Sequence, residues 1–159
     1  MADTLANYPS NSKQEKKSLK LLIFSVGKLM LSLPVDDVEK VINLPEIYSS
    51  GLNSLAVAHG EDGEIVVIDL HKKLFNISAV PDSKDENAYL VIAQNTMDEK
   101  FGIIVTETPS IVDVPMSEVR VLPKSYRQAD TLEIASHVTV INYDNKPLTV
   151  FIIDSDQVL

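Results

Sequence analysis

The sequence has no cysteine and no tryptophan, and glycine is scarce, with five among 159 residues. Without cysteine the chain can form no disulfide, no thiolate metal site and no thiol nucleophile. Glycine-rich phosphate-binding loops need several glycines within one strand-to-helix turn, but the glycines here stand at Gly27, Gly51, Gly60, Gly63 and Gly102. Thiol chemistry and the two common glycine-rich modes of nucleotide binding are therefore excluded.

Positive charge is also in short supply, because 14 Lys and Arg residues face 23 Asp and Glu residues, for a net charge of −9. This is the wrong sign for a protein that binds phosphate backbones, so we expect no nucleic-acid partner. The longest apolar run is residues 88–93, far short of the roughly 20 residues that cross a bilayer. We therefore expect no direct membrane insertion.

The first 17 residues, MADTLANYPSNSKQEKK, lack the apolar stretch of a secretory signal. Their polar composition predicts a disordered tail, followed by one domain over residues 18–159. The missing signal and the missing cysteines together favour a cytoplasmic protein.

Beyond this tail, short runs rich in Val and Ile alternate with turn residues, which is typical of strands joined in hairpins. Asp-Gly and other polar turn pairs separate the runs. The pattern predicts four hairpins, which pair residues 20–26 with 28–34, 54–59 with 64–70, 88–94 with 100–106, and 137–143 with 148–154.

Two connections between the hairpins stand out. Residues 35–42, VDDVEKVI, carry apolar side chains at helical spacing directly after Pro34, which predicts a short amphipathic helix. Residues 80–87, VPDSKDEN, form a polar linker. We expect this linker to divide the domain into one subdomain over about 18–80 and a second over about 85–159.

The two halves resemble each other. VVIDLHKKL (66–74) aligns with FIIDSDQVL (151–159), which places Asp69 on Asp154, and Val38 falls on Ile111 in a second alignment. Each half supplies about five short strands, enough to close into a small barrel without exposed edges. The predicted fold is mainly β, with two small five-stranded β-barrel subdomains and short connecting helices.

Catalytic constellations are missing from the sequence. Its three histidines are far apart and form no His-x-x-x-His pair, and no Gly-x-Ser-x-Gly elbow accompanies the serines. Asp69 and Asp154 each end an apolar strand, where a carboxylate can accept hydrogen bonds from a turn or helix start. We interpret both as structural and expect no enzyme activity, no metal and no cofactor.

Four stretches, taken in order, resemble the CheW family of chemotaxis coupling proteins: residues 21–47, 63–75, 101–115 and 147–159. In that family they form the first hairpin with its helix, a strand ending in a Val-Asp-Leu-like motif, a Gly-hydrophobic-Val-Asp segment, and the closing strand. The resemblance covers about 19–159 and implies two five-stranded barrels. It also implies a non-catalytic adaptor that joins chemoreceptor tips to the regulatory domain of the histidine kinase CheA.

Carried over by position, the receptor-facing groove between the barrels would include Val38, Val41, Leu90 and Ile111. A second set of candidates lies in the second hairpin, where the family commonly has an Asn-Leu-Arg-Gly stretch and this chain has acidic residues instead. Replacing a basic side chain by an acidic one turns attraction into repulsion. His59, Glu61 and Asp62 are therefore candidates for an altered contact with the kinase or an array neighbour.

Three functions remain open from the sequence. The first is the coupling adaptor, in chemotaxis or in a specialised pathway such as pilus motility or phototaxis. The second is a small ligand-binding or hydrolytic enzyme with its site between the two barrels. The third is a CheW-like scaffold that assembles with itself or with a paralogue.

Overall fold

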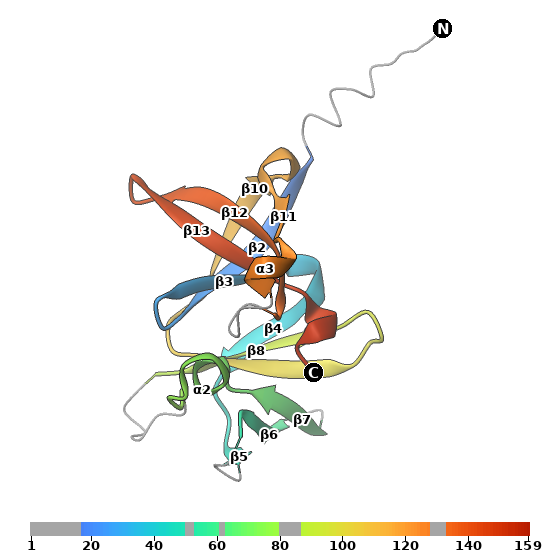
Figure 1. Ribbon diagram of the computed structural model, residues 1–159. Helices are drawn as coiled ribbons and strands as arrows, with labels where there is room; N and C mark the ends of the chain where they lie inside the picture. Colours follow the sequence, from blue (N-terminus) through green and yellow to red (C-terminus); the bar gives the residue numbers. More distant parts are fainter. Residues whose placement is uncertain (1–16, 50–52, 61–62, 80–86, 128–132) are drawn as a thin grey trace, which may run out of the picture.

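The computed structural model describes residues 17–49, 53–60, 63–79, 87–127 and 133–159, so the predicted tail lies, except for Lys17, outside the described residues. The described strands form two sheets (Figure 1). The first has the order β10-β2-β3-β13-β12-β11, built from β2 (Ser18–Val26), β3 (Leu29–Pro34), β10 (Ser110–Pro115), β11 (Arg120–Val121), β12 (Ala135–Tyr143) and β13 (Lys146–Ile153).

The second sheet has the order β4-β8-β9-β7-β6-β5, built from β4 (Val38–Asn43), β5 (Ile47–Ser49), β6 (Leu55–Gly60), β7 (Gly63–Ile68), β8 (Tyr89–Gln94) and β9 (Lys100–Val105). Helices are short in the described chain: α2 (Leu70–Phe75), α3 (Lys124–Arg127), and the 3-10 turns η1 (Val35–Asp37), η2 (Met116–Glu118) and η3 (Ser155–Gln157).

In each sheet, the two strands at opposite edges are consecutive in the sequence, so the sheet closes on itself. Strands β4 and β5 stand at opposite ends of the second sheet, yet only residues 44–46 separate them. Strands β10 and β11 stand in the same relation in the first sheet, joined through η2. Each pair acts as one broken strand, so each sheet has five strand positions. The predicted mainly β fold of two small barrels is confirmed, and we call these sheets the first and second barrel.

The repeat in the sequence is real, but its two copies are interleaved. Each copy supplies a hairpin, a broken strand and a second hairpin, in that order. The initial hairpins are exchanged: β2-β3 joins the strands of the later copy through the parallel pair β3–β13, and β8-β9 joins those of the earlier copy through β7–β9. The linker at 80–87, of which only Asn87 is described, therefore does not separate the barrels. Subdomains at about 18–80 and 85–159 do not match the sheets, because each barrel takes strands from both ranges.

All four predicted hairpins are present, as the antiparallel pairs β2–β3, β6–β7, β8–β9 and β12–β13. The predicted helix over 35–42 is wrong, since only Val35–Asp37 is helical and the rest forms β4. The register of β4 shifts between Val38 and Lys40, which marks a β-bulge. A bulge adds one residue to the period of two that is normal for a strand. Val38 and Val41 therefore share a face although they are three residues apart, which is also the spacing expected for one face of a helix.

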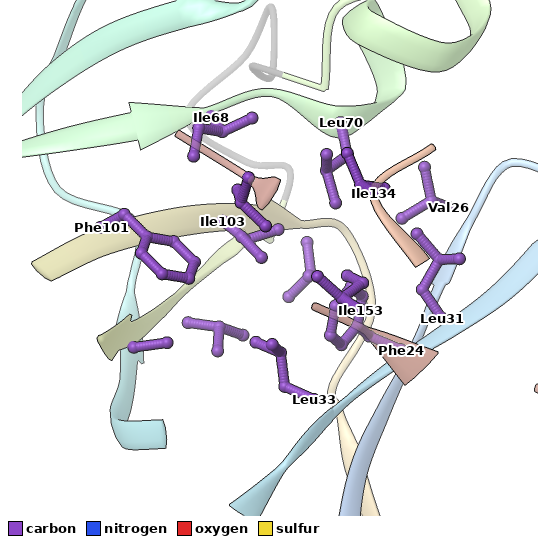
Figure 2. Close-up of a cluster of buried hydrophobic side chains, with 14 of the residues drawn as sticks. Phe24, Val26, Leu31, Leu33, Ile68, Leu70, Phe101, Ile103, Ile134 and Ile153 are labelled. Atoms are coloured by element: carbon purple, nitrogen blue, oxygen red, sulfur yellow. The ribbon is translucent and has the colours of Figure 1, made fainter. Parts of the chain in front are cut away.

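Most buried apolar side chains fill three spaces, and Leu122 and Ala135 form a small fourth cluster. The first and second barrels have their own interiors, and a larger central core lies between them (Figure 2). Strand β2 serves two of these spaces by alternation, because Leu21 and Ile23 point into the first barrel while Leu22 and Phe24 point into the central core. Strands buried on both faces explain the nearly continuous apolar runs of the sequence.

Candidate functional site

Strand β4 carries two of the predicted groove residues on one face. Val38 stands opposite Ala93, and Val41 stands opposite Val91, both of which belong to the central core. Directly opposed residues in an antiparallel pair share a face of the sheet. Val38 and Val41 therefore lie on the face toward the central core. Val38 is half-buried against it, whereas Val41 is 39% exposed.

Strand β10 presents Ile111 in an equivalent way. Ile111 stands opposite Leu22, another member of the central core, so it too lies on the core-facing side of its barrel. Its side chain is 62% exposed because β10 lies at the end of its sheet. Val38, Val41 and Ile111 thus occupy equivalent core-facing positions in the two barrels, and we call this set of residues the β4–β10 face.

Leu90 does not belong to this face. It stands opposite Ile42 and packs inside the second barrel, where it is 1% exposed. The run AYLVIAQ is apolar on both faces, so its periodicity cannot tell an inward residue from an outward one. The prediction that Leu90 lines a receptor groove between the barrels is wrong for the structure described here.

The second set of candidates is described only in part. His59 lies on β6 with its side chain half exposed, and its ring packs edge-on against Tyr48 at 4.8 Å between centroids. Its Nε2 lies 3.3 Å from Glu64 Oε2. Glu61 and Asp62 lie outside the described residues.

Asp69 and Asp154 have the structural role expected from the sequence. Asp69 accepts hydrogen bonds from the Lys72 N–H at 3.1 Å, the Ser78 hydroxyl at 3.1 Å and the Ala79 N–H at 2.8 Å. Asp154 accepts one from the Asp156 N–H at 3.0 Å. Both carboxylates thus cap the helical turns that follow their strands.

The histidines are dispersed over different elements, with His59 on β6, His71 on α2 and His137 on β12. Burial lowers the pKa of His71, while nearby Asp69 acts in the opposite direction. Within the described ranges, no three His, Asp or Glu side chains are grouped so that they could hold a metal ion.

Sequence reasoning missed a cavity of about 440 Å³ at the mouth of the second barrel, which we call the second-barrel cavity. Its rim includes Glu39, Lys40 and Lys100, and Leu90 and Ile92 belong to its floor. The bulge in β4 puts Lys40 opposite Ile92, on the same face of the strand as Ile42. The sequence prediction of a helix over residues 35–42 did not put Lys40 on this face. A strand with a bulge after Val38 would have predicted it.

Comparison with known proteins identifies the family of the chain. Residues 20–159 match the model of the CheW-like domain family, so the chain belongs to that family and is a non-catalytic scaffolding domain. Its fold is similar to that of a solved structure, the scaffolding protein TtCheW from Thermoanaerobacter tengcongensis, with a TM-score of 0.66 and 21% sequence identity. That match covers 86% of this chain and 89% of the other. No curated protein matches the sequence.

None of the helices in the described ranges has the length and apolar character needed to cross a membrane.

Proposed function

We propose that this protein couples chemoreceptors to a CheA-type histidine kinase in a chemosensory pathway of the cytoplasm. It does so by binding the helical tip of a receptor and the regulatory domain of the kinase at the same time. Membership of the CheW-like family supports the scaffolding part of this proposal.

The β4–β10 face is the observation that carries the receptor part of the proposal. Ile111 and Val41 are exposed apolar side chains on two strands that occupy equivalent places in the two barrels. An amphipathic helix binds such a surface by laying its own apolar side chains against it. Exposed apolar residues at the centre of a contact supply most of its affinity.

Ile111→Asp tests this face. Ile111 is mostly exposed, so the fold should tolerate the change, whereas Val38→Asp would also disturb the central core. We expect at least about a tenfold loss of co-sedimentation with receptor-containing membranes, as for other interface anchors. Val140→Asp is the matched control, because Val140 is also exposed, at 53%, but lies on β12. Equal binding by both variants, with unchanged melting temperatures, would contradict the proposed receptor surface.

The kinase contact is proposed for the tip of the β6–β7 hairpin, around His59, Glu61 and Asp62. An acidic tip would repel a partner that expects a basic one. Glu61→Arg should therefore strengthen binding to a generic CheA regulatory domain and leave receptor binding unchanged. An unchanged kinase affinity would exclude this hairpin as the altered contact. It would also remove the argument for a divergent partner in pilus motility or phototaxis.

The alternative of an enzyme with its site between the barrels has no support from the packing. The central core fills that space with 15 buried apolar residues, shown in part in Figure 2.

A further inference from the structure

The hairpin of β12 and β13 extends beyond the rest of the first barrel (Figure 1), and we call its outer part, residues 139–149, the arm. Strand β11 pairs with β12 only at His137 and Val138, and β3 pairs with β13 only over 150–152. In the described part of the chain, the two strands of the arm therefore pair with each other and with no third strand. The open side of β12 over Thr139–Tyr143, which we call the free edge, can thus accept another strand.

Three other edges of the two barrels carry residues that hinder such pairing. In natural proteins, charged side chains, prolines and bulges keep open edges from pairing with other chains. Strand β10 has Asp113 and Pro115, and the β13 side of the arm has Lys146 and Pro147. Strand β4 has a bulge. The free edge, with the sequence TVINY, has no charge, no proline and no bulge, so it is suited to pairing with a strand of another molecule.

We propose that two copies of this chain pair through their free edges, antiparallel and about a two-fold axis at Ile141. Asn142 stands opposite Pro147, and proline has no N–H, so these two residues cannot exchange both bonds of a hydrogen-bonded pair. Such pairs alternate along an antiparallel ladder, so the backbone groups of Val140 and Asn142 point away from β13. The two-fold register places Val140 of each copy opposite Asn142 of the other. It therefore gives each of these backbone groups a partner.

Charges beside the free edge are complementary in this register. The Thr139 hydroxyl donates to the Glu118 carbonyl at 2.9 Å, and Glu118 lines a cavity of about 220 Å³ at that end of the edge. Tyr143 of the second copy stands opposite Thr139, and Lys146 is the partner of Tyr143 in the hairpin. Opposed residues share a face of a sheet, so Lys146 of the second copy approaches Glu118. Neither side chain forms an ion pair within the described residues of one chain, so both charges are available to the dimer.

The contact is small, but it covers exposed apolar surface. Val140 and Tyr143 are 53% and 46% exposed in the single chain, and the pairing brings a strand of the second copy against both. One short strand from each chain buries less than the about 1,200 Å² of a stable interface. We therefore expect a weak dimer that forms as the protein concentration rises. The proposal is independent of the coupling function, because the β4–β10 face and the tip of the β6–β7 hairpin take no part in the contact.

Sedimentation velocity of the full chain tests the proposal. We expect the sedimentation coefficient of the parent protein to rise with concentration toward that of a dimer. Asn142→Pro removes an outward N–H without removing a bond to β13, and proline is tolerated on edge strands. It should raise the dissociation constant by about tenfold or more, because the two-fold axis removes two bonds. Asn142→Ala, the matched control, keeps the N–H and should dimerise like the parent.

A parent protein that stays monomeric at every concentration would overturn the proposal. Equal dimerisation of Asn142→Pro and Asn142→Ala, with circular dichroism showing both to be folded, would overturn it as well.

Charge exchange tests the same register without changing the backbone. Lys146→Glu should weaken dimerisation by about fivefold or more, because each of two equal pairs changes from attraction to repulsion. Adding Glu118→Lys to this variant should restore the dimer. Lys73→Glu, on α2, makes the same change in net charge away from the arm and should have no effect. If the double variant is not restored, or if Lys73→Glu weakens dimerisation as much as Lys146→Glu, the pairing of the free edges is refuted.

Discussion

Asp69 and Asp154 occupy equivalent places in the two repeats, but their carboxylates have different numbers of hydrogen bonds. Asp69 is 4% exposed and accepts three, one of them a buried bond from Ala79. Asp154 is half-buried and accepts one, in an exposed position. We therefore expect Asp69→Ala to destabilise the protein much more than Asp154→Ala, although both remove a cap.

The magnitudes follow from the environments of these bonds. Leaving the buried Ala79 N–H unpaired costs about 2 kcal/mol, and losing the bonds from Lys72 and Ser78 costs about 1 kcal/mol each, so Asp69→Ala should lose about 4 kcal/mol of unfolding free energy. Asp154→Ala should lose about 1 kcal/mol, the usual cost of a removed N-cap. The expected difference is about 3 kcal/mol, well above the error of urea unfolding.

Urea unfolding followed by circular dichroism measures both variants. Asp69→Asn serves as a shape control, because its single amide oxygen can accept either from the Lys72 N–H or from the Ser78 hydroxyl and the Ala79 N–H, but not from both sides. It should lose less stability than Asp69→Ala. Equal losses for Asp69→Ala and Asp154→Ala would refute the reasoning, since they would show that the two additional bonds contribute nothing to stability.

Two further predictions concern the interleaving of the two repeats and the pH dependence of stability. Fragments 18–80 and 85–159 should each be unfolded alone and should regain β-sheet circular dichroism when mixed, because each barrel needs strands from both; a cooperative unfolding transition in either fragment alone would contradict this. Burial and the neighbouring carboxylates raise the pKa of Asp37, so its contribution to stability is full below the ordinary carboxyl pKa and is lost as pH rises through the raised value. Asp37→Asn should therefore raise the melting temperature near about pH 7 and change it little near about pH 3; equal shifts at both pH values would exclude this effect.

The sequence predicts local pairing in this protein better than it predicts long-range pairing. All four hairpins follow from alternation and turn residues, because a hairpin joins strands that are adjacent in the chain. The exchange of hairpins between the repeats leaves no such signal. Both the interleaved and the separate arrangement bury the same apolar runs and preserve the same self-similarity. The subdomain boundaries could therefore not be derived from the repeat.

The candidate site shows the same limit at the level of single residues. Val38 and Ile111 align in the repeat and stand on equivalent strands, β4 and β10, although the helix predicted over 35–42 put Val38 on the wrong type of element. Leu90 was misplaced because β8 is apolar on both faces, so no alternation reports which residue points inward. Lys40 was overlooked because one inserted residue in β4 changes a strand pattern into an apparently helical one.

Internal comparison of the two barrels separates what the fold needs from what can vary. The backbone N–H groups of Asp69 and Asp154 donate to Ser54 and Ile134 respectively, both at 2.8 Å, just before equivalent strands begin. These contacts recur because each barrel must anchor its final hairpin in the same way. The mouths of the barrels do not recur, since the charged lining residues are Asp113 and Glu118 in the first and Glu39, Lys40 and Lys100 in the second. A duplicated barrel can therefore vary the side chains at its two mouths while the hydrogen bonds that anchor its final hairpins stay the same.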